Sequence, residues 1–375
     1  MNDVPVRRFF DADSHVLEPN DWLRPYADPA IRDRLRTLAH PQAPSNEEAA
    51  DIVARRSSTD REHLCGTGYK AFGAWSPTER SAVLDEFGID AQLVFSTFAP
   101  GQFLSDDLDL LYGGVRAHTR ALADFCSHDP RLLAAPLIPF TDVDRAINEL
   151  EVALETGCGA ILVQTRAPSK TMGPSHVALD PFWARLQEAD VPFVTHVGTG
   201  GRLVPTGYRE NGRTVPPDFL GGGENIRSKD FINIGYWPEN FFSALALDGV
   251  FERFPVLRGA SIEQGAEWVP GMLKKLDGAM QFARTEPDLA SLRLKASEYI
   301  ARQVKFTPFP KDDVGWVLDQ VGPELLLFST DYPHPEGTRD PFDRFDAHLG
   351  RFDTRTQDRF YVENMRELLG SANPA

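Results

Sequence analysis

Three apolar segments, far apart in the sequence, each end on a histidine or an aspartate, and this pattern restricts the possible folds more than any other. The first passes through Phe9 and Phe10 into Asp11-Ala12-Asp13-Ser14-His15. The second spans residues 191–196 and ends on His196, and the third spans 325–331 and ends on Asp331. In a (β/α)₈ barrel the reactive side chains lie at the C-terminal ends of the parallel strands. One such barrel accounts for all three segments.

The residue types at these strand ends favour a metal site. Side chains alternate between the two faces of a strand, so we expect Asp11, Asp13 and His15 to share one face. Two carboxylates and an imidazole are unfavourable in a buried site without a cation, and such ligands suit zinc, manganese or iron. For the first segment alone, acids that face water explain the pattern equally well. Three such strand ends in one chain make a metal site the better interpretation.

Length and charge narrow the class of protein. The 375 residues are enough for one large core with loop insertions, and we expect a single domain over residues 1–375. The formal net charge of -16 disfavours nucleic acid and anionic membranes as partners, because both require clustered lysines and arginines. Cys65, Cys126 and Cys158 lack metal-type spacing, which predicts reduced thiols in a cytoplasmic protein. Residues 1–8 carry no apolar signal region and no stretch approaches membrane-spanning length, so we expect neither a signal peptide nor a membrane span.

Strands and helices alternate from Phe9 onwards, as an α/β barrel requires. We expect strands at residues 8–13, 89–96, 132–139, 160–164, 191–196, 256–262, 299–307 and 325–331. We expect helices at residues 77–87, 104–127, 142–156, 181–188, 238–254, 268–281, 310–321 and 357–369. Two insertions, at about 19–76 and 198–237, are predicted to cover the C-terminal mouth of this TIM-like barrel.

The second insertion is rich in glycine and proline and does not follow a regular pattern. We interpret it as a lid that sets substrate choice, and a disordered or dimer-contact loop is an equally good interpretation. Its arginines could pair with a substrate carboxylate: Arg202, Arg209, Arg213 and Arg227. Aromatic side chains of both insertions could enclose a ring, although most could simply pack on the barrel: Trp22, Tyr69, Phe72, Trp75, Phe219 and Trp237.

Six short motifs follow one another along nearly the whole chain, at residues 11–16, 195–198, 249–255, 263–270, 329–337 and 363–369. Together, and in this order, they resemble the amidohydrolase-2 family, which includes the aminocarboxymuconate-semialdehyde decarboxylases and the dihydroxybenzoate decarboxylases. The resemblance implies a TIM-like barrel with a divalent metal held by Asp13, His15, His196 and Asp331. We expect zinc first, with manganese or iron as alternatives and one or two ions.

The sequence departs from the family at the end of the sixth predicted strand. Many family decarboxylases have a histidine there that handles the proton, but residues 259–263 contain none. Glu263 is the replacement we expect, as a proton carrier or a further metal ligand; the alternative is a carboxylate that only ties its loop to a neighbour. His334 could be a general acid, a ligand or a turn-stabilising group. The candidate catalytic residues are therefore Asp331, Glu263 and His334, with Glu18 as a weaker candidate.

We expect a metal-dependent hydrolase or decarboxylase that cleaves a C–C, ester or amide bond of a small cyclic or aromatic carboxylic acid or carbonyl compound. The candidate site is rich in carboxylates as well as histidines, so a dinuclear non-haem iron oxygenase on the same barrel is an alternative. A third interpretation is a binding protein that keeps the barrel without activity. The partners we expect are a small-molecule substrate and a second copy of the chain in a homodimer.

Overall fold

The computed structural model describes residues 8–38, 40–56, 66–214, 226–309, 311–335 and 341–374. Its strands run in parallel and alternate with helices along the chain. The strands are β1 Phe9–Val16, β2 Ile89–Ser96, β3 Leu132–Ala134, β4 Ile161–Leu162, β5 Phe193–His196, β6 Gly259–Ile262 and β7 Val304–Phe306.

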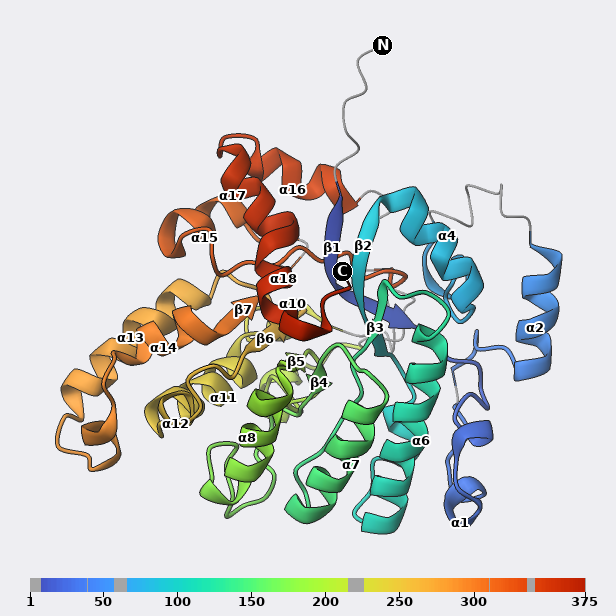
Figure 1. Ribbon diagram of the computed structural model, residues 1–375, viewed down its shortest axis with the longest axis horizontal. Helices are drawn as coiled ribbons and strands as arrows, with labels where there is room; N and C mark the ends of the chain where they lie inside the picture. The colour runs from blue at the N-terminus through green and yellow to red at the C-terminus, as the bar shows by residue number, and fades with distance from the viewer. Residues whose placement is uncertain are drawn as a thin grey trace.

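Hydrogen bonds join these strands into a ring, which Figure 1 shows at the centre of the molecule. β1, β2 and β3 pair in order, and so do β4 to β7, with a bridge between Leu137 and Leu162 linking the two groups. The segment 325–332 pairs with β7 through Phe306 and returns to β1, because His15 N donates to Tyr332 O at 2.7 Å. This segment takes the place of the eighth strand, and the predicted TIM-like barrel is confirmed.

Helices surround the ring and cover its outer face (Figure 1). They are α4 Pro77–Phe87, α5 Pro100–Phe103, α6 Leu108–Cys126, α7 Val143–Glu155, α8 Asp180–Ala189, α11 Tyr236–Leu247, α12 Val250–Arg253, α13 Val269–Phe282, α14 Ala296–Gln303, α15 Val314–Val321, α16 Pro341–Leu349, α17 Thr354–Asp358 and α18 Asn364–Leu369. In α6, Asp107 caps the N-terminus by accepting from the backbone N–H groups of Asp109 and Leu110. Leu111, Val115 and Leu122 form part of the buried face of this helix.

The strand predicted at residues 299–307 is wrong over its first half. Residues 296–303 form α14, and only Val304–Phe306 belong to a strand. Ala296, Tyr299, Ile300 and Gln303 are buried together, which is the spacing of one face of a helix. The β-propensity of tyrosine and isoleucine misled the prediction because burial on a helical face outweighs it here.

Several other predicted boundaries differ from the structure, and three of them illustrate the reasons. The helix predicted at 104–127 begins at Leu108, after the cap at Asp107. The helix predicted at 238–254 is divided into α11 and α12 at Gly249, whose φ of 73° lies in the left-handed region that interrupts a helix. The strand predicted at 132–139 is regular only over Leu132–Ala134.

The first insertion packs across the ends of β1 and of the eighth segment. It contains η1 Arg24–Tyr26, α1 Pro29–Arg32, α2 Asn46–Arg55 and η2 Gly68–Lys70. The backbone N–H of Gly68 donates to Pro333 O at 2.6 Å, and the Tyr69 hydroxyl donates to Glu18 O at 3.0 Å. This end of the insertion is therefore held beside the C-terminal ends of the strands.

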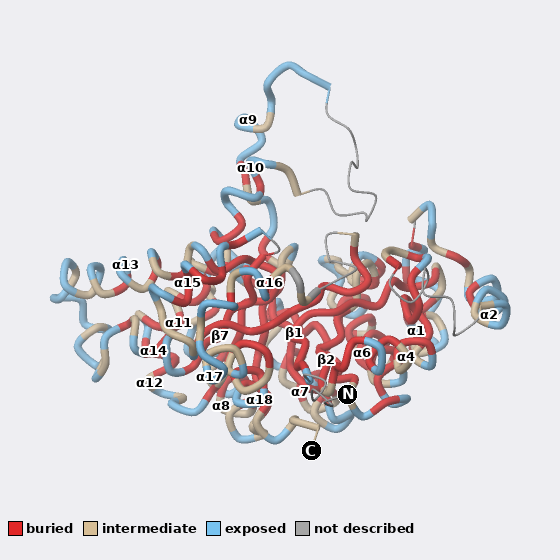
Figure 2. Tube along the Cα trace, turned by 90° about the horizontal axis from the view of Figure 1, so that it is seen from above, coloured by how far each residue is buried: buried red, intermediate tan, exposed pale blue. Residues whose placement is uncertain are grey.

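The second insertion contains short helices, so the expectation of no regular structure is wrong for α9 Thr206–Arg209 and α10 Ser228–Phe231. Figure 2 shows both helices standing clear of the barrel body. Arg209 forms an ion pair with Asp230 and so joins the two helices. Residues 215–225, with Phe219 and the glycine run, lie outside the described residues. We call residues 198–214 and 226–237 the arm.

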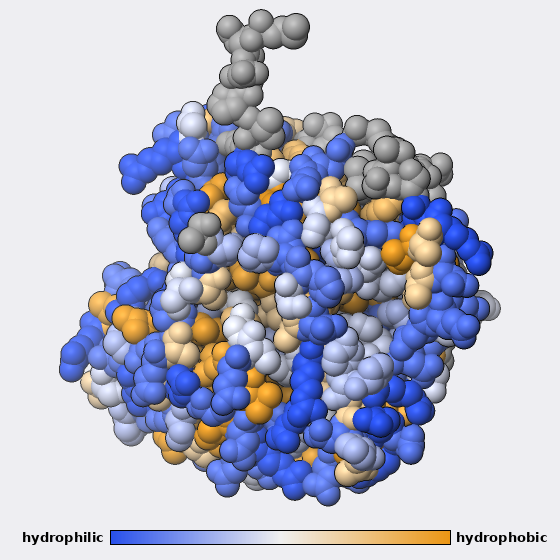
Figure 3. Space-filling model, turned by 45° about the vertical axis from the view of Figure 1, so that its right-hand side comes forward, coloured by the Kyte–Doolittle hydropathy of each residue, from blue (hydrophilic) through white to orange (hydrophobic). Residues whose placement is uncertain are grey.

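The surface drawn in Figure 3 is largely hydrophilic, with smaller hydrophobic areas between the hydrophilic side chains. Cys126 and Cys158 are buried and form no disulfide, while Cys65 lies outside the described residues. Among the helices of the described ranges, none is long and apolar enough to cross a membrane.

Candidate metal centre

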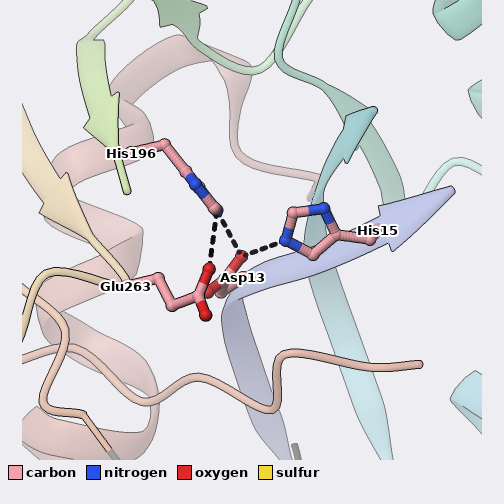
Figure 4. A group of neighbouring side chains, drawn as sticks. All are labelled: Asp13, His15, His196 and Glu263. Carbon is pink, nitrogen blue, oxygen red and sulfur yellow. Dashed lines mark hydrogen bonds and ion pairs between the residues drawn. The ribbon is translucent and has the colours of Figure 1, made fainter. Parts of the chain in front are cut away.

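Six buried side chains with metal-binding atoms meet at the C-terminal ends of the strands. Asp13 and His15 come from β1, His196 ends β5, Glu263 follows β6, and Asp331 with His334 ends the eighth segment. None of the six is more than 5% exposed. Figure 4 shows four of them, Asp13, His15, His196 and Glu263, pointing toward one another from three separate strands. The structure thus brings together the five predicted metal ligands and His334, whereas Asp11 and the weaker candidate Glu18 lie outside the cluster.

The distances allow shared coordination. Asp13 Oδ1 lies 3.3 Å from both His15 Nε2 and His196 Nε2, and His196 Nε2 lies 3.5 Å from Glu263 Oε2. Asp331 Oδ1 lies 3.6 Å from His15 Nε2. The donor atoms fall into two overlapping groups in which all atoms lie within 4.8 Å of one another. The groups are Asp13, His15, His196 and Glu263, and His15, Glu263, Asp331 and His334.

Two of these carboxylates are held by unusual backbone geometry. Glu263 and Asp331 have φ values of 53° and 55°, in the left-handed region that residues other than glycine rarely adopt. Glu263 N donates to the Thr307 hydroxyl at 2.7 Å, and Asp331 N donates to Asp13 O at 2.9 Å. Backbone strain of this kind is concentrated at functional sites, where neighbouring contacts maintain it.

The electrostatics of the cluster suit a bound cation. Burial alone would raise the pKa of Asp13, but His196 and His15 outweigh it and hold that pKa below its ordinary value. Burial and the neighbouring His334 lower the pKa of His15 to about 3, so His15 is a neutral imidazole at neutral pH, as a ligand must be. Among the described residues, Asp13 Oδ2 and His15 Nδ1 have no hydrogen-bond partner although both are buried. These donors fit a divalent metal.

His334 lies between the Thr97 hydroxyl and the Asp331 carboxylate. The Thr97 hydroxyl donates to Val16 O at 2.9 Å, so toward His334 Nε2, 3.0 Å away, it can only accept. His334 Nε2 therefore carries a hydrogen. His334 Nδ1 faces Asp331 Oδ1 at 3.0 Å, and two lone pairs at this distance would repel. Unless a cation lies between them, one of these two atoms carries a proton.

Asp11 is not part of the cluster, so its predicted position beside Asp13 and His15 is wrong. The pairing of β1 with β2 shifts register between Asp11 and Ser14, which breaks the alternation of faces. Asp11 instead accepts hydrogen bonds from Gln92 Nε2 at 2.8 Å and from the Thr330 hydroxyl at 2.6 Å. It links β1, β2 and the eighth segment.

Arg80 and Glu18 are two further buried charged residues that support the site. Arg80 donates to the backbone oxygens of His15 and Gly73 and to the side chain of Gln92. Glu18 accepts from the backbone N–H groups of residues 97, 98 and 99 at 2.8, 2.9 and 3.1 Å, and so fixes the loop that carries Thr97. Sequence reasoning missed Arg80, because an arginine in a predicted helix gives no sign that it points inward.

A cavity of about 180 Å³ adjoins the cluster. Its lining includes His15 and His196, the apolar side chains of Phe95 and Leu104, and Ser96. An apolar cavity of about 150 Å³ holds one benzene molecule, so this space is large enough for a single ring. Five of the aromatic residues predicted to enclose a ring lie in the described ranges, and none of the five lines this cavity. Trp22, Tyr69, Phe72 and Trp75 are buried in packing contacts instead, and Trp237 lines a separate cavity at the base of the arm.

None of the four arginines predicted to meet a substrate is among the residues that line this cavity. Arg209 pairs with Asp230, and Arg202 donates to the Thr206 hydroxyl at 2.6 Å. Arg202 and Arg209 both line the cavity of about 240 Å³ at the base of the arm. That cavity shares Val197 and Gly198 with the cavity beside the cluster.

Acidic and imidazole groups gathered at the C-terminal ends of parallel barrel strands define a metal-binding (β/α)₈ enzyme. The chain belongs to the amidohydrolase family, whose model matches residues 11–371. The family prediction is thereby confirmed over nearly the whole sequence.

Relatives and solved structures agree with this assignment. A gamma-resorcylate decarboxylase of Rhodococcus jostii is 24% identical over 268 residues, which cover 68% of this chain and 76% of the relative. The crystal structure of an amidohydrolase from Mycobacterium avium subsp. paratuberculosis has a TM-score of 0.77 at 23% identity, covering 97% of this chain and 99% of the other. A dihydroxybenzoic acid decarboxylase from Polaromonas, solved with manganese and 2-nitroresorcinol, has a TM-score of 0.64 at 18% identity and covers 97% of each chain.

The chain is therefore an enzyme of the hydrolase or carboxy-lyase kind that uses a divalent metal. These relatives do not favour the dinuclear iron oxygenase. The roles of the individual side chains remain predictions.

Proposed function

We propose that this protein is a metal-dependent decarboxylase of a hydroxylated aromatic carboxylic acid. The observation that carries the proposal is the ring-sized cavity beside a buried cluster of three carboxylates and three histidines. The named activity of the Rhodococcus relative, a resorcylate decarboxylase, supports the same substrate class.

We assign the metal to Asp13, His15, His196 and Asp331, with Glu263 as a fifth ligand. Carboxylate and imidazole donors suit manganese or zinc equally. The Polaromonas structure contains manganese, so we place manganese before the zinc expected from the sequence. When bound, the metal would polarise a substrate oxygen and compensate the carboxylate charge.

The protein side chains would hold the ring and supply the proton. Phe95 and Leu104 offer apolar contact to a ring in the cavity. In decarboxylation the C–C bond to the carboxylate breaks, CO₂ leaves, and the electron pair stays on the ring carbon until a proton arrives. We assign this step to a proton carried by His334, which lies 3.0 Å from Asp331. Thr97 and Glu18 keep His334 in position.

The test is an assay of the manganese-loaded and the zinc-loaded protein on a panel of hydroxybenzoates, with matching aryl esters and anilides. We expect release of CO₂ from at least one hydroxybenzoate with an ortho hydroxyl, and elemental analysis should find metal in the active protein. Ester or amide hydrolysis without any CO₂ release would overturn the decarboxylase assignment in favour of a hydrolase.

A further inference from the structure

A half-buried serine and a buried histidine form a pair at the edge of the cavity, apart from the metal cluster. Ser96 ends β2 and lines the cavity beside His15 and His196. His118, in α6, is fully buried, and its Nε2 lies 2.7 Å from Ser96 Oγ. The proposed proton transfer does not use either residue.

The surroundings of His118 decide which of its nitrogens carries the hydrogen. Burial lowers the pKa of His118 to about 3, so its ring is neutral at neutral pH and has one N–H. Nδ1 has no hydrogen-bond partner within the described ranges, and the rings of Phe103 and Trp22 lie around the imidazole, with centroids 5.7 and 6.5 Å away. A buried N–H without an acceptor is rarer in proteins than an under-used acceptor. The hydrogen therefore belongs on Nε2, where it is donated to Ser96 Oγ.

This tautomer leaves the Ser96 hydroxyl with a proton to give. Ser96 Oγ accepts from His118, and among the described residues no acceptor is found for its own hydrogen. Neighbouring hydroxyls at the cavity differ, because Thr97 donates to Val16 O and Thr199 donates to His196 O at 2.6 Å. Of the three hydroxyls at this cavity, the Ser96 hydroxyl is thus the one that is held by a neighbour and still has its hydrogen available for a ligand.

We propose that Ser96 is a specificity residue that donates a hydrogen bond to an oxygen substituent on the substrate ring, with His118 as the positioning residue that fixes the direction of the hydroxyl. The inference rests on the proposed function and deepens it. It adds that the preferred substrate carries, besides the carboxylate that reacts, an oxygen substituent on the side of the ring that faces β2. A site built to satisfy such an oxygen discriminates against the analogue that lacks it.

The first experiment measures the tautomer. The zinc-loaded protein with ¹⁵N-labelled histidine is studied by NMR, and the His118 signals are assigned by their loss in His118→Gln. We expect a proton-bearing Nε2 and a bare Nδ1. A proton on Nδ1 would make Ser96 the donor to His118 and would overturn the proposal. This readout does not depend on turnover.

The second experiment compares 2,6-dihydroxybenzoate with 2-hydroxybenzoate, which differ by one ring oxygen. We expect Ser96→Ala to lower kcat/KM for the dihydroxy acid about 10-fold and to change that for the monohydroxy acid much less. Ser96→Thr should restore the preference because it keeps the hydroxyl. The matched control is Thr119→Val, which removes a buried hydroxyl next to His118 that donates only to Val115 O of its own helix and should not alter the ratio.

Equal losses on both acids in Ser96→Ala would overturn the specificity role. If the wild-type protein turns over neither acid, calorimetric binding of the same two acids to the zinc-loaded protein measures the preference directly, and the panel of hydroxybenzoates decides the proposed function separately. Equal affinities in that measurement would overturn the inference independently of the reaction.

Discussion

Asp331 has a strained backbone, and its carboxylate lies 3.6 Å from His15 and 3.0 Å from His334. Asp331→Asn keeps the shape of the side chain but removes its charge, so the residue can neither bind the metal strongly nor exchange a proton with His334. We expect turnover to fall by about 10³-fold or more, as for loss of a group that acts in the transition state. Steady-state kinetics at saturating metal measure this, with circular dichroism to show that the fold is retained. Near-normal activity would contradict the assignment.

Arg80 supports the site from beneath, and within the described ranges its guanidinium donates to backbone, hydroxyl and amide oxygens and not to a carboxylate. Its planar group reaches oxygens on several elements at once, and a lysine ammonium cannot match that geometry. Arg80→Lys should lower the free energy of unfolding by about 2–3 kcal/mol and weaken metal binding through the displaced His15 backbone. Chemical denaturation and metal titration measure the two effects.

The matched control is Arg145→Lys, at a half-exposed arginine paired with Asp109. Such surface pairs contribute at most about 1 kcal/mol, so this variant should remain close to the wild type in both measurements. Similar losses in the two variants would show that Arg80 has no special connection to the site.

The arm stands clear of the barrel, so its contribution to the site has to be tested separately. Its base is closely packed, because a Cβ added to Gly200 would lie 2.2 Å from the Trp237 ring. Gly200→Ala should therefore displace Trp237 and lower kcat/KM about 10-fold, with metal content unchanged, if the arm covers the substrate. Gly207→Ala is the control, since nothing lies within 4 Å of its added Cβ. Identical kinetics in both variants would show that the arm is not part of the site.

The strands that carry the ligands could be predicted from the sequence because each is a short apolar run that stops at a polar residue. β5 and the eighth segment are examples, ending at His196 and Asp331. The position of Asp11 could not be predicted, since it depends on a register shift that only the pairing with β2 creates. α14 was missed for a related reason: Tyr299 and Ile300 favour strands locally, and the helical burial pattern is decided by what packs against them.

The cavity wall shows the same limit. Phe95 and Ser96 are the last residues of a correctly predicted strand, yet their sequence alone does not indicate that one faces the ligands and the other faces His118. The ring-binding residues were predicted in the insertions because these are rich in aromatic residues. In the structure Trp22, Tyr69, Phe72 and Trp75 pack in the hydrophobic clusters of the first insertion and the barrel instead. Composition shows which segments carry large apolar side chains, but it does not show whether they pack in the core or line a binding site.

For the whole molecule, bound metal should contribute to stability as well as to activity. A ligand that binds only the folded state at about 100 times its Kd adds about 2.7 kcal/mol, which corresponds to about 3 °C in Tm for a chain of this length. We expect chelation to lower Tm and manganese to restore it in a concentration-dependent way, as measured by calorimetry. A Tm that does not respond to metal in the wild type would argue against the assigned cluster.

The arm also bears on assembly, for which we expect a homodimer. Tyr208, Ile232 and Tyr236 on the arm are 75, 82 and 51% exposed, an unusual set of apolar side chains for a free surface. Ile232→Asp should shift sedimentation from dimer toward monomer, whereas Phe282→Asp, at an exposed site in α13, should not. If the wild-type protein sediments as a monomer, the expected homodimer is wrong.

The left-handed conformations of Glu263 and Asp331 lower the stability of the fold, so selection for activity and selection for thermal stability favour different residues at these two positions. Each such residue stores about 1 kcal/mol or more that a glycine would release. In a library selected for heat resistance alone, without metal or substrate, these two positions should therefore be among the first to change. A natural or laboratory lineage that keeps both residues has therefore remained under selection for the reaction, even where the rest of the barrel has changed.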